Sequence, residues 1–232
     1  AASLCTELLE RGTEKYSAEE IAGYFDSIGG TLNLSSQSNT SYLQSTVLKD
    51  DAATALDYIH QVVCKPTFPQ AEFDNVRELR LARIGARSAN AQAEIMDFFA
   101  SQLPATSPYS RTALGRADTV SKLTRDEIKA TWSRLFVPQN MVVSVFGDID
   151  IAAMKELVTK SFGTLPKSSN PPDYNFPPRH GPFEKLRAEH LTNKKKNTGM
   201  VLISYPTVSI RVEKTRDCLD VLDAILTGGG AA

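Results

Sequence analysis

One pair of side chains in this sequence has the types and the spacing of metal ligands. His60 and Cys64 are four positions apart in a segment with helical periodicity, so they would lie on one face of a helix. Imidazole and thiolate both bind zinc and related metals. Two ligands are too few for a site, and the other histidines, His180 and His190, lie in or after a proline-rich stretch. We therefore expect His60 and Cys64 to mark a half-buried helix end.

Other chemical signatures are weaker. No histidine has a motif around it, so the sequence offers no Ser/His/Asp or Cys/His arrangement for nucleophilic catalysis. The glycine run at 228–230 follows a helical segment and lacks G-K-(S/T), whereas a phosphate loop follows a strand and precedes a helix. We expect a turn there. The lysines at 194–196 are expected at the solvated tip of a hairpin.

The composition is that of an ordinary globular chain. Of the 232 residues, 41% are apolar and 23% are charged, and the formal net charge is −1. This balance indicates no nucleic-acid partner. No apolar run approaches the roughly 20 residues of a membrane span, and no signal peptide is visible. The three cysteines have no C-x-x-C spacing and do not indicate a disulfide framework.

The periodicity predicts an α+β fold, with helices packed on one face of an antiparallel-rich sheet. Ser17 and Glu20 have the spacing of a capping box, and Thr124 and Asp150 are further N-cap candidates. A helical stretch is predicted at 70–103, with a bend expected near Gly85 or 88–90. The other predicted helices cover 1–11, 17–28, 50–63, 124–136, 150–162 and 213–226, and predicted strands cover 31–38, 41–48, 140–147, 183–191 and 198–205.

One segment has a sequence pattern typical of a peptidase family. Residues 11–21 read Arg-Gly-Thr-Glu-Lys-Tyr-Ser-Ala-Glu-Glu-Ile. This is similar to (K/R)-G-T-x-K-x-(S/T)-x-x-E-(I/L), which follows the zinc-binding helix in the pitrilysin/insulinase family of zinc metallopeptidases, here of processing-peptidase-like type. Later stretches resemble other family segments in the same order: 48–51, 109–116, 136–142, 146–150 and 226–230.

The resemblance implies which residues stand at the family's catalytic positions. In active members the preceding helix carries H-x-x-E-H, and counting back from Gly12 places the histidines at Ser3 and Glu7 and the catalytic glutamate at Thr6. A hydroxyl and one carboxylate are a poor zinc pair, and Thr6 cannot act as a base. The nearest counterpart of the third ligand is Glu78, either a relic ligand or a solvated helix carboxylate. We therefore expect no catalytic residue, zinc or other cofactor in this chain.

The resemblance also implies two related lobes. Residues 1–166 would form a first metallopeptidase-like lobe that lacks its N-terminal strands, and 167–182 a proline-rich linker or loop. Residues 183–232 would begin a second, truncated lobe. Apolar residues of that lobe, such as Val201, Ile203 and Leu222, would then be poorly covered, which favours aggregation.

Two functions follow from the resemblance. Family members work as paired halves that enclose a chamber, so this chain would be a non-catalytic half that closes the chamber. It would hold extended peptide by edge-strand pairing for a zinc-bearing half, and be inactive alone. The alternative is a scaffold subunit, like the family-derived core subunits of respiratory complexes. A zinc-bearing partner would favour the role of a protease half. Purification in a respiratory assembly would favour the scaffold role. The compartment stays open between bacterial periplasm, cytoplasm and mitochondrial matrix.

Overall fold

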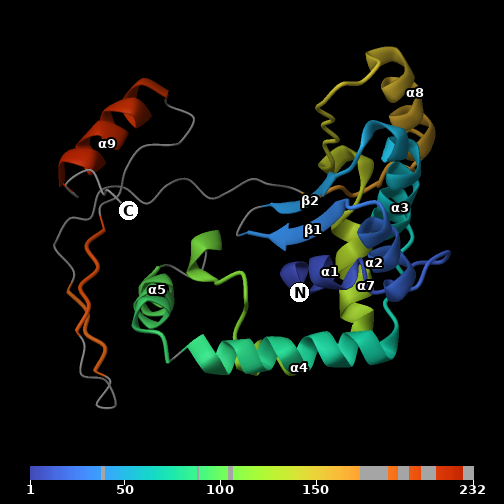
Figure 1. Ribbon diagram of the computed structural model, residues 1–232. Helices are drawn as coiled ribbons and strands as arrows, with labels where there is room; N and C mark the ends of the chain where they lie inside the picture. The colour runs from blue at the N-terminus through green and yellow to red at the C-terminus, as the bar shows by residue number, and fades with distance from the viewer. Residues whose placement is uncertain are drawn as a thin grey trace. The chain divides into compact units, whose positions relative to one another are not determined.

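The computed structural model describes residues 1–37, 40–87, 89–103, 107–172, 188–192, 199–204 and 213–226. The chain divides into two compact units, Ala1–Phe176 and Pro177–Ala232. Figure 1 colours them from blue at the N-terminus to red at the C-terminus. The positions discussed below as a candidate site all lie in the first unit.

The first unit packs helices around a small antiparallel sheet, so the predicted α+β class is confirmed (Figure 1). Its two described strands are β1 (Thr31–Ser36) and β2 (Ser41–Thr46). Short 3-10 turns lie at Lys49–Asp51, Pro108–Ser110 and Pro138–Asn140. Its described α-helices are α1 (Ala2–Leu8), α2 (Ala18–Ser27), α3 (Ala52–Cys64), α4 (Gln70–Arg87), α5 (Ala91–Gln102), α6 (Ala117–Val120), α7 (Arg125–Leu135) and α8 (Ile151–Phe162).

Helix α1 lies at the centre of this unit. It contacts β1, α4 and α7, as Figure 1 shows. Apolar residues of α1 at helical spacing, Leu4 and Leu8, are fully buried, and they share one core cluster with Phe73 of α4 and Ile128 of α7. Burial of each such side chain stabilises the fold by about 1.5–3 kcal/mol. A seven-residue helix is too short to be stable in water alone, so this packing is what holds α1.

The two strands form a hairpin with a regular register. Thr31 pairs with Thr46 at one end and Ser36 with Ser41 at the other. Leu34 lies opposite Leu43, and both pack against the core. The alternation of apolar and polar residues therefore predicted the buried face of this hairpin correctly.

Helix starts follow local capping rules. Ser17 and Glu20 form the predicted capping box at the start of α2, and Asp150 caps α8 by accepting from the Ala153 amide over 2.8 Å. Thr124 is the N-cap of α7, and Glu127 completes a capping box there. Each cap satisfies amide groups that have no partner inside the helix.

The predicted helical stretch at 70–103 is two helices. Helix α4 ends at Arg87 and α5 begins at Ala91, near the bend expected at 88–90. Asn90 caps α5, because its side-chain oxygen accepts from the Ala93 amide over 3.0 Å. An Asn with extended backbone at this position starts a new helix.

The prediction of a buried strand at 140–147 is wrong. These residues form no strand, and Val142 and Phe146 are 92% and 91% exposed. An apolar run becomes a strand only where a neighbouring strand accepts its hydrogen bonds. Within the part of the chain that the structure describes, the sheet consists of β1 and β2, and neither pairs with this run.

The second unit contains helix α9 (Glu213–Leu226), which matches the predicted helix. The described parts of the two predicted strands, 188–191 and 199–204, do not form strands, and the rest of both predictions lies outside the described residues. Val201, Ile203 and Leu222 are exposed, as expected for poorly covered residues. The lysine cluster at 194–196 and the glycine run at 228–230 lie outside the described residues. None of the described helices is long and apolar enough to cross a membrane.

Candidate functional site

The candidate site is the exposed side of helix α1 with the facing side of α4. The chain leaves α1 through Gly12, whose φ of +133° favours glycine. A Cβ there would also approach Pro69 Cγ to 3.2 Å. The Gly12 carbonyl accepts from the Thr67 amide over 3.0 Å, which fixes the end of α1 beside the start of α4. This junction holds the two helices together and so positions the side chains between them.

Position 6, where the resemblance places a catalytic base, holds a buried hydroxyl. Thr6 is 2% exposed. Its Oγ1 donates to the Ala2 carbonyl over 3.2 Å and lies 2.8 Å from Ser41 Oγ on β2. The hydroxyl is therefore used in helix and sheet contacts, and it cannot take a proton from water.

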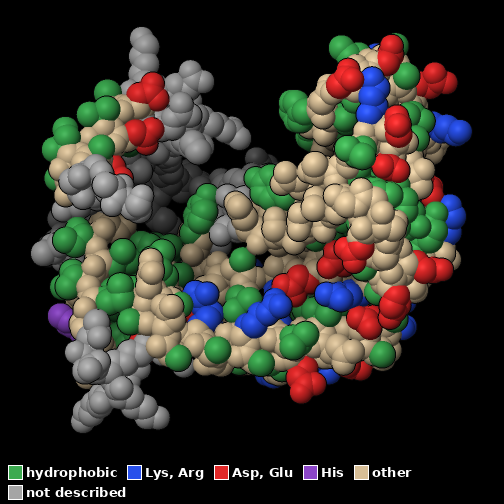
Figure 2. Space-filling view, viewed as in Figure 1, with side chains coloured by type: hydrophobic (Ala, Val, Ile, Leu, Met, Phe, Trp, Pro, Cys, Tyr) green, Lys and Arg blue, Asp and Glu red, His purple; other side chains and the backbone are tan. Residues whose placement is uncertain are grey.

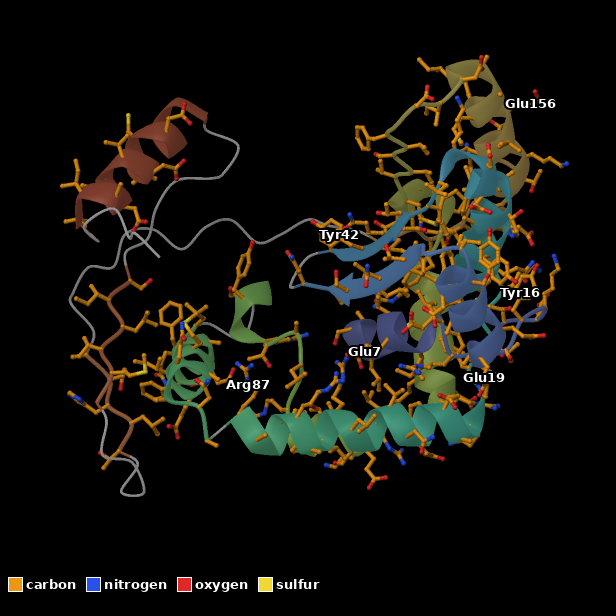
Figure 3. The ribbon with its side chains drawn as sticks, viewed as in Figure 1. Glu7, Tyr16, Glu19, Tyr42, Arg87 and Glu156 are labelled. Carbon is orange, nitrogen blue, oxygen red and sulfur yellow. The ribbon has the colours of Figure 1, made fainter. Side chains whose placement is uncertain are left out.

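Positions 3 and 7, where the resemblance places histidines, contact an arginine of α4. Nη1 of Arg80 donates to Ser3 Oγ over 2.5 Å, and its Nη2 lies 2.9 Å from Glu7 Oε2. Ser3 Oγ in turn donates to the carbonyl of Ala113, which also accepts from Arg80 Nη1 over 3.4 Å. Figure 3 places Glu7 in the space between α1 and α4. The motif positions therefore surround a guanidinium group.

The burial of the two partners is unequal. The side chain of Arg80 is 3% exposed and that of Glu7 is 33% exposed. Arg80 Nε is buried and has no hydrogen-bond partner. A buried cation without a counter-charge would cost several kcal/mol, so the Glu7 carboxylate is what makes this burial tolerable.

A second arginine shares the Glu7 carboxylate. Arg83 Nη1 lies 3.3 Å from Glu7 Oε1, but its side chain is 59% exposed. On the face drawn in Figure 2, basic and acidic side chains are intermingled where α1 and α4 meet. Arg83 lies at the rim of the cluster and Arg80 at its centre.

Glu78, the expected relic ligand, lies elsewhere. It is exposed on α4, two positions before the buried Arg80. Two residues along a helix correspond to about 200° of rotation, so Glu78 lies on the opposite face of α4 from Arg80. The structure does not bring Glu78 together with Ser3, Thr6 and Glu7.

The sequence of α4 carries a pattern that points to these arginines. Arginines recur on α4 at 77, 80, 83 and 87, a spacing of three or four that marks one side of a helix. Arg77 pairs with Asp74 and with the Leu123 carbonyl, and Arg87 forms a double contact with Asp97. Which arginine would be buried was not predictable from that spacing.

The His60 and Cys64 pair has neighbours typical of packing. The His60 ring meets the Phe162 ring at 5.6 Å, edge to face. Burial raises the pKa of the Cys64 thiol to about 11, which disfavours the thiolate that a metal requires. His190 is exposed and His180 lies outside the described residues. Among the residues that the structure describes, no group of three or more His, Cys, Asp or Glu side chains could hold a metal.

The donor set on α1 and α4 does not fit zinc. A zinc ion needs about three protein ligands with lone pairs directed at it, roughly 2 Å away. Here the space between positions 3 and 7 contains the N–H groups of Arg80, which donate and carry positive charge. The oxygen ligands that remain are the Glu7 carboxylate and the Ser3 hydroxyl, and this hydroxyl is already hydrogen-bonded to the Ala113 carbonyl.

Comparison with known proteins agrees with this fold. Residues 1–116 match the model of the insulinase family, peptidase family M16, and residues 122–232 match that of the peptidase M16 inactive domain. The chain therefore belongs to the insulinase family of peptidases. The matched segment 1–116 contains Ser3, Thr6 and Glu7.

Relatives with similar sequences are named zinc proteases. An uncharacterized zinc protease of Streptomyces coelicolor is 26% identical over 225 residues, which is 96% of this chain and 49% of that protein. One of Mycobacterium tuberculosis is 29% identical over 164 residues, 71% of this chain and 37% of that protein. The chain thus spans about half or less of the length of these relatives.

Solved structures share the fold. The crystal structure of a peptidase M16 inactive domain from Pseudomonas fluorescens matches with a TM-score of 0.69 at 22% identity, over 74% of this chain and 42% of that one. The periplasmic protease PqqL from Escherichia coli matches with a TM-score of 0.66 at 21% identity, over 75% of this chain and 20% of that one. At these identities the likeness concerns the fold alone.

Proposed function

We propose that this chain belongs to the non-catalytic half of an insulinase-type zinc protease. It closes the chamber of the protease and holds extended peptide, while a homologous half with H-x-x-E-H supplies the zinc and the catalytic glutamate. A bacterial periplasmic or cytoplasmic location or the mitochondrial matrix would each suit such an assembly.

The observation that carries this proposal is the buried contact between Arg80 and Glu7. In an active half, α1 would present two metal ligands and a base. Here Glu7 pairs with the guanidinium of Arg80 at 2.9 Å, and the Thr6 hydroxyl is hydrogen-bonded to Ser41 of β2. Hydrolysis by a zinc-bound hydroxide needs both the metal and the base, so the catalytic machinery must come from another half.

The hairpin β1–β2 supports the peptide-holding role. Among the described residues each strand pairs only with the other, so each has an outer edge without a strand partner. An extended peptide can add to such an edge through main-chain hydrogen bonds, largely independently of its sequence. This suits a protein that holds varied unfolded peptides.

A cleavage assay tests the proposal. The chain is mixed with a quenched fluorescent peptide of about 20 unstructured residues, alone and with a family member from the same genome that carries H-x-x-E-H. We expect no cleavage by the chain alone, and an increase in kcat/KM when the chain is added to the zinc-bearing protein.

Two controls decide the result. Replacing the motif histidines of the partner by alanine should abolish cleavage by the mixture, because the partner holds the metal. Cleavage by this chain alone that survives repurification and stops with a chelator would overturn the proposal. If the chain neither cleaves nor changes the partner's kcat/KM, the peptide-holding role is wrong and the scaffold role is favoured.

A further inference from the structure

The cluster between α1 and α4 has the layout of a cation site whose cation is a side chain. Two oxygen atoms on one face of α1, Ser3 Oγ and Glu7 Oε2, lie 2.5 and 2.9 Å from the two terminal nitrogens of Arg80. The Ala113 carbonyl adds a third oxygen at 3.4 Å. A guanidinium group carries a permanent positive charge in proteins.

We propose that Arg80 is a built-in cation that occupies the metal position of this lobe and keeps divalent metal ions out. A metal bound between positions 3 and 7 would have to lie roughly 2 Å from their ligand atoms, in the space that the Arg80 nitrogens occupy. The exclusion is both steric and electrostatic, because a like charge at such a distance disfavours the ion strongly. This goes beyond the loss of ligands on which the proposed function rests.

Burial is what distinguishes Arg80 from its neighbour. Arg83 contacts the same Glu7 carboxylate at 3.3 Å, but 59% of its side chain is exposed, so it can turn into solvent when a metal arrives. The side chain of Arg80 is 3% exposed and is enclosed among α1, α4 and the Ala113 segment, so it cannot turn into solvent. The proposal therefore assigns the exclusion to Arg80 and not to the arginines of α4 in general.

The experiment compares three variants of the full chain. All contain Ser3→His and Glu7→His. The first has no further change, the second adds Arg80→Glu, and the third adds Arg83→Glu as the matched control. The second and third have identical composition and charge, and both supply a carboxylate on α4. Each variant is dialysed against zinc, then against buffer, and its zinc is measured by elemental analysis, with circular dichroism as the check on folding.

We expect the variant with Arg80→Glu to retain about one zinc per chain, since two imidazoles and a carboxylate are a known catalytic ligand set. The other two should retain less than about a tenth of that, because Arg80 still fills the position. The proposal would be overturned if all three variants retained zinc equally or if none retained it. Zinc retained by the Arg83→Glu variant alone would also overturn it.

A second measurement applies if the histidine variants do not fold. Two double-mutant cycles are measured by thermal midpoint. The first contains Glu7→Gln, Arg80→Met and the double variant, and the second contains Glu7→Gln, Arg83→Met and the corresponding double variant. If Glu7 holds Arg80 in a cation site, the stability effects of Glu7→Gln and Arg80→Met should be strongly non-additive. Those of Glu7→Gln and Arg83→Met should be nearly additive. Equal coupling in the two cycles would overturn the assignment to Arg80. Neither measurement uses peptide cleavage, so failure here is distinguishable from failure of the proposed function.

Discussion

Thr6 Oγ1 and Ser41 Oγ lie 2.8 Å apart, and this contact joins the centre of helix α1 to the start of strand β2. The two residues are far apart in the sequence, yet their hydroxyls satisfy each other at a site where Thr6 is almost completely buried. A polar group buried in this way is stable only while its partner is present.

Introducing the family's catalytic glutamate should therefore destabilise the chain. We expect Thr6→Glu to lower the free energy of unfolding by about 3 kcal/mol or more, because a larger and charged side chain would be buried without a counter-charge. Thr6→Val, which keeps the shape, should cost about 1 kcal/mol. Urea unfolding followed by circular dichroism measures the stability of both variants. Equal urea midpoints for Thr6→Glu and Thr6→Val would contradict the burial of this position.

Replacement by alanine should destabilise the chain strongly at one phenylalanine and hardly at all at another. Phe73 is 1% exposed in the core between α4 and α1, whereas Phe146 is 91% exposed in the run at 140–147. Phe73→Ala should cost about 3–5 kcal/mol, since it leaves a cavity. Phe146→Ala should change stability by no more than about 0.5 kcal/mol. The comparison is made by urea unfolding, and a large effect at Phe146 would show that the run is covered.

The capping box of α7 should make the chain sensitive to acid. Glu127 Oε2 accepts hydrogen bonds from the amide and the hydroxyl of Thr124, and these bonds, the amide first, lower the pKa of its carboxyl below the ordinary value of 4.5. A lowered folded-state pKa stabilises the fold above the unfolded pKa, and the contribution is lost as pH falls through the folded value.

We therefore expect Glu127→Gln to lower the thermal midpoint at about pH 6, and to have a smaller effect as the pH falls through the lowered folded-state pKa and the wild-type carboxyl itself becomes protonated. Glu156→Gln, at an exposed glutamate of α8 that is labelled in Figure 3, controls for the loss of one negative charge. A Glu127→Gln effect that stays constant across this range would show that the cap does not depend on the charge.

The three cysteines should differ in reactivity. Burial raises the pKa of Cys5 to about 12 and that of Cys64 to about 11, so both stay protonated at neutral pH. Cys218 on α9 is exposed. Because the thiolate is the reactive form, a maleimide at about pH 7.5 should label Cys218 first, Cys64 slowly and Cys5 last.

Mass spectrometry of peptides from a labelling time course checks this order. In denaturant all three cysteines should react at similar rates. The raised pKa values also predict that folding stability falls as pH rises from the ordinary thiol value of 9.0 toward 11 and 12, because the unfolded chain then ionises first. Fast native labelling of Cys5 would mean that α1 opens readily.

The sequence alone determined those features that depend on a few neighbouring residues. The capping boxes at Ser17 and Thr124 and the Asp150 cap were predictable because a cap needs only the side chain and the amides of the next turn. The hairpin β1–β2 was predictable because its alternation and its short connection are local. The resemblance to the family placed Ser3, Thr6 and Glu7 at the motif positions, because their distance from Gly12 along the chain is fixed.

Only the tertiary structure decided what occupies the space beside those residues. The spacing of the arginines on α4 indicated one face of a helix, but the packing of α4 against α1 determines that Arg80 is buried and Arg83 is not. The run at 140–147 shows the same limit, since its apolar pattern predicted burial and its side chains at 142–146 are exposed. Burial depends on which distant segments are adjacent, and the pattern of a single segment does not contain that information.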